Sequence, residues 1–179
     1  PKKRGEAIML IIEAGMNGIS EERLKDLATQ MIENKVFLCP TLYVQTAMAE
    51  SEHSDENAEE DENTIFRNKM VTLMNNLGIH FVQKLSEYGV KMLVGQDNRK
   101  PEGTLEEMKL MEKHGVSTVE VLKGATIYPA QWLGVDSKYG SVEPNKIADL
   151  VILNANPLDN IANVGEIFMV IQRGVIIDK

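Results

Sequence analysis

Asp97 is the residue of this sequence that is best placed to carry out chemistry. It follows the apolar run at residues 90–95 (VKMLVG) almost directly. In parallel α/β architectures the C-terminal ends of the strands line the functional site. A carboxylate at such a position can bind a metal ion or act as a general base. The alternative is a structural role, because Asp beside Gly and Asn is common in turns.

Two further polar residues follow a second apolar run. Residues 36–39 (VFLC) are bounded by Pro40, and Thr41 and Tyr43 come next. A short continuous apolar run of this kind is typical of a strand that is buried on both faces. Thr41 and Tyr43 would then lie at the C-terminal end of that strand, where they could contact a ligand.

The single cysteine and the three histidines form no recognisable catalytic or metal-binding motif. No pair among His53, His80 and His114 has the HxH or HExxH spacing that places two ligands on one metal ion. Cys39 is expected to be a buried, inert thiol, since a nucleophile needs a histidine and an orienting partner. One cysteine also excludes a disulfide framework and a CxxC zinc site.

Composition limits the broad class of protein. The 179 residues carry a formal charge of −8, which predicts no general binding to nucleic acid or to anionic membranes. No run of about 18 apolar residues is present, so the sequence predicts no membrane span. The chain begins with Pro1 rather than Met, and we therefore expect a piece of a longer protein. Its compartment is not encoded here, and the cytoplasm is the preferred expectation.

Hydrophobic periodicity predicts alternating helices and strands. Helices are expected at residues 3–14, 21–34, 64–88, 104–114 and 117–132, and strands at 16–19, 36–39 and 90–95. This alternation predicts a parallel sheet with helical crossovers. After Gly134, short β-rich runs at 150–153, 168–171 and 175–177 predict a small β unit.

Residues 50–63 are strongly acidic and interrupt the periodic pattern. We expect them to form a solvated insertion between helices. Capture of a metal ion by their carboxylates is the alternative, although the spacing of an EF-hand loop is absent.

Several stretches together resemble the amidohydrolase superfamily. Residues 124–134 (GATIYPAQWLG) resemble its AT-x-x-x-A-x-x-L-G helix, and residues 140–153 (GSVEPNKIADLVIL) resemble the strand pair that follows. Residues 156–161 (NPLDNI) are similar to its NPL-x-D-I turn. Residues 89–97 resemble the eighth barrel strand, which ends in GTD, and residues 40–42 (PTL) resemble the motif after the seventh. The nearest branch is that of the imidazolonepropionase-like and Xaa-Pro-dipeptidase-like enzymes.

The resemblance implies an α/β fold. Residues 1–134 would form the C-terminal part of a metal-dependent (β/α)8 hydrolase barrel, strands six to eight, with the acidic insertion at 50–63. Residues 135–179 would form part of a small β-sandwich. The implied reaction is hydrolysis of an amide or other C–N bond in a small-molecule amide or dipeptide-like substrate, with zinc as the expected divalent metal. Asp97 would bind the metal and take a proton from the attacking water.

The metal ligands are where the sequence departs from the family pattern. The family's HxH of strand one, the bridging residue of strand four and the histidine of strand five have no counterpart here. Where strand six of the family ends in IEHG, Ile19 is followed by Ser20-Glu21-Glu22 and the histidine is gone. The strand-eight GTD is Gly95-Gln96-Asp97. Asp97 is therefore the one implied ligand that is present.

A single carboxylate does not hold a catalytic divalent ion, which needs about three protein ligands. We therefore expect a missing N-terminal half or a second copy of the chain to complete the site. A half barrel also exposes an open sheet edge, which predicts self-association or a partner chain. The alternative is a non-catalytic amidohydrolase-like fragment that acts as a binding or structural module.

Overall fold

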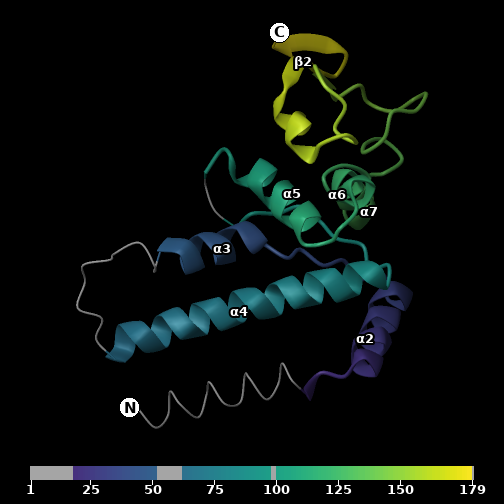
Figure 1. Cartoon of the computed structure of the whole chain (residues 1–179). Helices are drawn as coiled ribbons and strands as arrows, with labels where there is room; N and C mark the ends of the chain where they lie inside the picture. Colours follow the sequence, from purple (N-terminus) through teal and green to yellow (C-terminus); the bar gives the residue numbers. More distant parts are fainter. Residues whose placement is uncertain (1–17, 52–61, 98–99, 179) are drawn as a thin grey trace.

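The computed structural model describes residues 18–51, 62–97 and 100–178 (Figure 1). The elements in chain order are α2 (Glu21–Glu33), α3 (Leu42–Ser51), α4 (Glu62–Glu87), α5 (Gly103–Lys113), α6 (Thr118–Gly124), α7 (Ile127–Trp132), β1 (Leu150–Leu153), the 3-10 helix η1 (Ile161–Gly165), β2 (Ile167–Gln172) and β3 (Val175–Asp178). The predicted helix at 3–14, the start of the strand at 16–19, His53 and most of the acidic stretch lie outside the described residues. Gly18 and Ile19 do not lie in a strand.

The start of α2 and the ends of α4 and α5 lie at residues that capping chemistry favours. Ser20 is the N-cap of α2, and its Oγ accepts a hydrogen bond from Arg23 N at 3.3 Å. Gly89 and Gly115 follow α4 and α5 with φ of +85° and +96°, a conformation that glycine adopts without strain. The predicted helices at 21–34, 64–88 and 104–114 therefore match α2, α4 and α5 closely.

The predicted helix at 117–132 is wrong as one element, because it is divided into α6 and α7. Gly124 passes so close to the segment around Met92 that an added Cβ would lie 2.7 Å from Met92 O. Gly124 O accepts a hydrogen bond from Val94 N at 3.0 Å. The chain then turns through Thr126, whose φ and ψ are −133° and −86°. A tertiary hydrogen bond thus ends the helix that periodicity alone would continue.

The predicted strands at 36–39 and 90–95 are reduced to one parallel bridge between Leu38 and Met92. Leu38 N donates to Lys91 O at 3.0 Å, and Leu93 N donates to Leu38 O at 2.7 Å. The two segments therefore run side by side in the same direction, as the predicted parallel sheet requires.

The predicted burial of residues 36–39 on both faces is wrong. Val36 is 48 % exposed, and Cys39 is exposed as well. A parallel strand becomes fully buried only when strands flank it and helices cover both faces. Within the described residues Leu38 has the single neighbour Met92, so the side chains around it keep contact with solvent.

The core lies where α3, α4 and α5 pack around the bridged segments. In Figure 1, α3 runs along α4, and α5 lies on the other side of α3 from α4. The buried apolar residues that form one cluster are Ala28, Leu42, Val82, Leu85, Val90, Met92, Met108, Met111, Val116, Val121 and Ile161. Since Ile161 belongs to η1, the same core extends to the base of the small sheet.

The C-terminal region forms an antiparallel sheet of order β1–β2–β3, which confirms the three predicted short strands. Val151 pairs with Val170, and Gln172 pairs with Val175 across the turn at Gly174. Val151 is 56 % exposed and Ile176 is 53 % exposed, so the sheet keeps much of its apolar surface in solvent. Among the described helices, none combines the length and the apolar character of a membrane span.

Candidate functional site

The bridge between Leu38 and Met92 fixes the geometry of the candidate site. Because the two segments are parallel, the residues that follow them leave the pair at the same edge. Thr41 and Tyr43 follow the first segment, and Asp97 follows the second. The structure therefore places the three sequence-predicted site residues at the ends of neighbouring segments.

Electrostatics also indicate that these segment ends lie near one another. The pKa of the Cys39 thiol is raised, first by desolvation and then by the negative charges of Glu107 and Asp97. Cys39 is not the buried thiol that the sequence predicts, since its side chain is exposed. A raised pKa lowers the thiolate fraction, so inertness remains the expectation for Cys39 on a different physical ground.

Thr41 and Asp97 share an unusual backbone conformation. Their φ values are +50° and +49°, in the left-handed region that non-glycine residues rarely adopt. The conformation is costlier for Thr41, because its side chain is branched at Cβ. Strained residues of this kind cluster at functional sites, where the surrounding structure holds them in place.

Glu107 is a residue of this region that sequence reasoning missed. It lies on α5, its side chain is fully buried, and its two carboxylate oxygens accept hydrogen bonds from the backbone of α3. Leu42 N donates to Oε1 at 3.0 Å, and Tyr43 N donates to Oε2 at 2.6 Å. Burial raises the pKa of Glu107, while these two donors act in the opposite direction. Its spacing of four residues from Met111, on the core face of α5, is the signal that could have revealed it.

Gln96, next to Asp97, has a buried polar atom without a hydrogen-bond partner among the described residues. This atom is Oε1 of its side-chain amide. Buried acceptors are normally paired, because leaving one unpaired costs about 1–3 kcal/mol. The neighbourhood of Asp97 can therefore accept a hydrogen bond from a group that the described part of the chain does not supply.

The described residues do not fit a complete metal site. No three His, Cys, Asp or Glu side chains come together within residues 18–51, 62–97 and 100–178. His80 lies within α4, and His114 follows α5. The pKa of His114 is lowered by burial and by the charge of Lys113, which disfavours a positive charge on its imidazole. Asp97 remains one candidate ligand, and no catalytic step through a metal ion follows from these residues alone.

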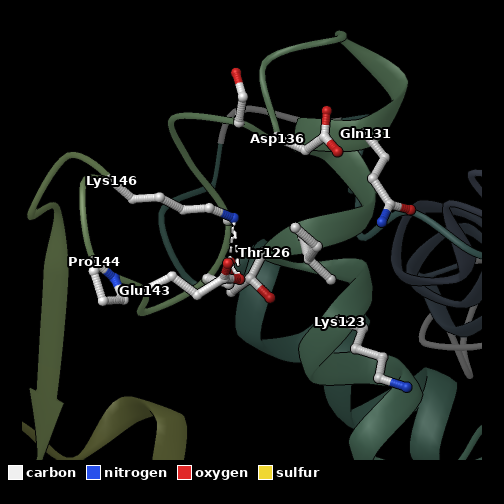
Figure 2. A pocket seen from close by; sticks show the side chains of 11 residues that line it. Lys123, Thr126, Gln131, Asp136, Glu143, Pro144 and Lys146 are labelled. Atoms are coloured by element: carbon white, nitrogen blue, oxygen red, sulfur yellow. Dashed lines mark hydrogen bonds and ion pairs between the residues drawn. The ribbon is translucent and has the colours of Figure 1, made fainter.

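A cavity of about 790 Å³ lies elsewhere, beside α6, α7 and the loop before β1 (Figure 2). Three of its polar side chains, Ser141, Glu143 and Lys146, are paired with one another. Lys146 Nζ contacts Ser141 Oγ at 2.5 Å and Glu143 Oε1 at 3.2 Å. Asp97, Thr41 and Tyr43 do not line this cavity, so it is distinct from the candidate site.

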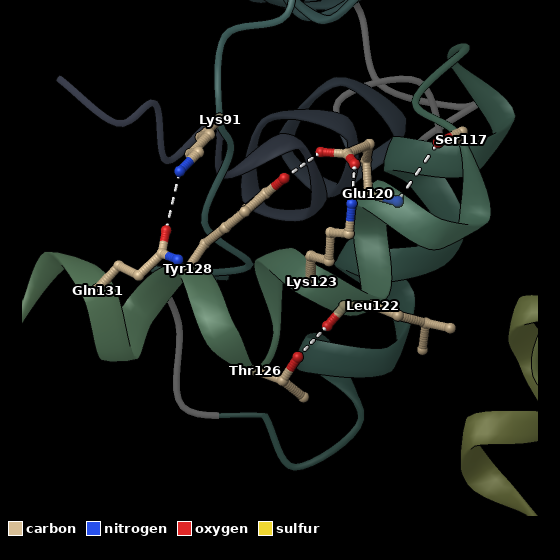
Figure 3. Close-up of polar contacts among 8 residues, drawn as sticks. All are labelled: Lys91, Ser117, Glu120, Leu122, Lys123, Thr126, Tyr128 and Gln131. Atoms are coloured by element: carbon tan, nitrogen blue, oxygen red, sulfur yellow. Dashed lines mark hydrogen bonds and ion pairs between the residues drawn. The ribbon is translucent and has the colours of Figure 1, made fainter. Parts of the chain in front are cut away.

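A network of polar contacts attaches α6 and α7 to the bridged segments (Figure 3). Lys91 Nζ donates to Gln131 Oε1 at 2.9 Å and lies 5.0 Å from the centre of the Tyr128 ring. Tyr128 donates from its hydroxyl to Glu120 Oε2 at 2.5 Å, and Lys123 donates to the other oxygen of Glu120 at 2.8 Å. Lys91 lies on the N-terminal side of Met92, and Asp97 follows on its C-terminal side. This network therefore holds the end of the two bridged segments that is opposite to Asp97.

Comparison with known proteins identifies the class. The sequence model of the amidohydrolase family matches residues 13–177, and the chain belongs to that family. Members of this family are hydrolases that are generally metal-dependent, and structural relatives cover most of the chain. The resemblance inferred from the sequence is thereby confirmed.

Individual relatives show how much of such a protein the chain represents. Imidazolonepropionase of Thermoplasma acidophilum is 44 % identical over 61 residues, which cover 32 % of this chain and 15 % of that protein. A Xaa-Pro dipeptidase with bound methionine shares the fold at a TM-score of 0.73 and 24 % identity, covering 86 % of this chain and 37 % of that one. A putative prolidase from Bifidobacterium longum has a TM-score of 0.64 and 27 % identity, covering 78 % and 34 % respectively. The chain thus spans little more than a third of the length of these two solved structures.

Proposed function

We propose that this chain is the C-terminal portion of a metal-dependent amidohydrolase barrel and that it contributes Asp97 to the hydrolytic site. The parallel bridge between Leu38 and Met92 carries the proposal, because it brings Asp97 to the edge that Thr41 and Tyr43 also reach. Membership of the amidohydrolase family supports the reaction class. The activity belongs to the complete barrel, since the chain alone covers a minor part of its relatives' length.

The proposed substrate is a small amide or dipeptide-like molecule with a hydrolysable C–N bond. The relatives named as Xaa-Pro dipeptidase, prolidase and imidazolonepropionase support this class. Thr41 and Tyr43 are the proposed substrate contacts, and the unpaired Oε1 of Gln96 can accept a hydrogen bond from a polar ligand. The ring of Tyr43, at the start of α3, offers an apolar surface of the kind that small-molecule sites use.

In this proposal a divalent ion, with zinc preferred, is held jointly by Asp97 and by ligands from outside the described residues. Those ligands come from an N-terminal half of the barrel or from a second copy of the chain. A divalent ion held there would supply carbonyl polarisation and water activation, and Asp97 would be the ligand that this chain contributes. This chain supplies one carboxylate and the two segment ends that position it.

The decisive experiment is the Asp97→Asn substitution in the complete barrel, assayed with Xaa-Pro dipeptides and N-acyl amino acids. We expect kcat/KM to fall by about 10²–10⁴-fold, the range typical of losing a positioned acid–base group. Asp159→Asn is the matched control, since Asp159 is an exposed carboxylate outside the site and should keep full activity. Turnover of the Asp97 variant at the wild-type rate would refute the assignment.

A non-catalytic module is the second candidate function. It is favoured by the lack of a three-ligand cluster among the described residues. It is also favoured by the sequence after Ile19, where Ser20-Glu21-Glu22 replaces the rest of the family's IEHG and no histidine follows. It predicts that the complete protein has no turnover in the presence of zinc, manganese or nickel. Hydrolysis of any of the test substrates that is lost with Asp97→Asn would exclude it.

We also propose that the chain associates with itself or with a partner through the open edge of the bridged pair. Val36 is 48 % exposed beside this edge, and the pairing of Leu38 leaves its other side without a strand within the described residues. Light scattering of the purified chain should show a dimer or larger species. A monomer at every concentration would contradict this assembly.

A further inference from the structure

Glu107 is the buried charge that the proposed reaction leaves unused. Its side chain is fully buried on α5, next to the buried Met108 and Met111. Placing a carboxylate among apolar side chains costs several kcal/mol unless hydrogen bonds compensate it. The compensation comes from a segment 64 and 65 residues away in the sequence, the first two residues of α3.

The contact is specific in its geometry. One oxygen accepts from Leu42 N at 3.0 Å and the other from Tyr43 N at 2.6 Å. These amides belong to the first turn of α3, where backbone donors have no partner within the helix. The positive end of the helix dipole also favours an anion there. A local Ser, Thr or Asp cap is the usual solution, whereas this chain uses a side chain from another helix.

The residue just before this contact is the strained one. Thr41, with φ of +50°, lies between Pro40 and Leu42. Gln45 Nε2 donates to Pro40 O at 3.0 Å, and Glu107 holds the amides on the other side. The strained conformation is therefore fixed from both directions, as a backbone outlier requires if it is to persist.

We propose that Glu107 is a positioning residue that holds Thr41 and Tyr43 in place at the edge shared with Asp97. Its carboxylate fixes the first turn of α3 and, through it, the strained Thr41. The expected effect on turnover rests on the proposed function, whereas the contact between Glu107 and the first turn of α3 does not. Glu107 acts through the backbone of Leu42 and Tyr43 rather than by contact with Asp97 or a substrate.

The test compares Glu107→Gln with Glu106→Gln. Gln keeps the size of the side chain but presents an amide donor to one of the two backbone donors. Glu106 is the preceding carboxylate of α5, is partly exposed and pairs with Lys109, so its variant controls for charge removal on the same helix. Amide hydrogen exchange of Leu42 and Tyr43 should become about 10-fold faster or more in Glu107→Gln, and should stay unchanged in Glu106→Gln.

Two further readouts separate positioning from general destabilisation. The pKa of Cys39, measured from the pH profile of thiol modification, should fall in Glu107→Gln, because a charge that raises it is removed. In the complete barrel, kcat/KM should fall by about 10–100-fold, as expected when reacting groups are displaced by about 1 Å. Unchanged exchange at Leu42 and Tyr43 would overturn the proposal, and so would faster exchange with full turnover in an active enzyme.

A second variant applies if Glu107→Gln does not fold. Asn adopts the left-handed region more readily than Thr, so Thr41→Asn should raise the melting temperature if Thr41 is strained as described. A lower melting temperature would overturn the argument. Amide exchange reports on Glu107 without any turnover, so failure of this inference is distinguishable from a failed Asp97 assignment, which the Asp97→Asn assay reports.

Discussion

Gly95 and Cys39 are in direct contact across the two bridged segments. A Cβ atom added to Gly95 would lie 2.5 Å from Cys39 Sγ, far inside van der Waals distance. The backbone of Gly95 is therefore the surface against which the sulfur packs. Because Gly95 is two residues before Asp97 and Cys39 is two residues before Thr41, this contact fixes how closely the two site-bearing ends approach.

The first prediction concerns this contact. Gly95→Ala should lower the free energy of unfolding by about 1 kcal/mol, the low end of the cost of overpacking, because the exposed Cys39 side chain can shift. Adding Cys39→Ala should recover most of that loss, because the Sγ atom is then gone. Urea denaturation of the single and double variants measures the coupling.

Gly18→Ala is the control for this experiment, since a Cβ at Gly18 would meet no atom within 4 Å. Gly18→Ala should not show the loss of stability that is expected for Gly95→Ala. If the effects of Gly95→Ala and Cys39→Ala simply add, the two residues are not in contact and the account is wrong.

The second prediction compares two tyrosine–glutamate hydrogen bonds. Tyr128 is 7 % exposed and donates to Glu120 at 2.5 Å, and burial together with this carboxylate raises its pKa. Tyr88 donates to Glu21 at 3.0 Å in an exposed setting. Tyr128→Phe should cost about 1–2 kcal/mol, because it leaves a partly buried carboxylate without one of its donors. Tyr88→Phe should produce no measurable loss in the same thermal or urea unfolding experiment, and equal losses would contradict this difference.

The third prediction is a pH dependence of stability. Burial raises the pKa of Glu107 above its ordinary value of 4.5 in the folded state, so the folded chain binds this proton more tightly than the unfolded chain. The free energy of unfolding therefore falls as pH rises from about 4.5 through the folded-state pKa, and levels off above it. Glu107→Gln removes this contribution.

Urea unfolding of wild type and Glu107→Gln between pH 4.5 and pH 8 tests the sign. The stability of wild type relative to the variant should decrease with increasing pH in this window. Glu106→Gln should show no such relative decrease. Parallel curves for wild type and Glu107→Gln would show that burial does not raise the pKa of this carboxyl.

The fourth prediction concerns metal content. The described residues bring no three candidate ligands together. If the missing ligands come from an N-terminal half of the barrel, the purified 179-residue chain should hold far less than one zinc, manganese, iron or nickel ion per molecule. Its melting temperature should not change with a chelator, because a ligand stabilises a protein only when it binds the folded state. Stoichiometric metal in elemental analysis would show that a site assembles from residues beyond Asp97, for instance across an oligomer.

Local patterns in the sequence predicted much of the helical structure correctly. Ser20 begins α2, and Gly89 and Gly115 follow α4 and α5, because caps and left-handed glycines act within one turn of the chain. The short strands after Gly134 were also predictable, since β-branched runs between glycines need no distant partner to be recognised. The break between α6 and α7 was not, because it depends on the tertiary hydrogen bond from Val94 to Gly124.

The sequence by itself determined the family, the position of Asp97 after an apolar run, and the presence of Thr41 and Tyr43 after another. Tertiary structure alone decided that Leu38 pairs with Met92, that Gly95 packs on Cys39 and that Glu107 holds the start of α3. The physical reason is how far apart in the sequence the interacting residues lie. Capping and periodicity act between residues a few positions apart, whereas the buried carboxylate of Glu107 meets donors 64 and 65 residues away, and only the packing of α5 against α3 brings them together.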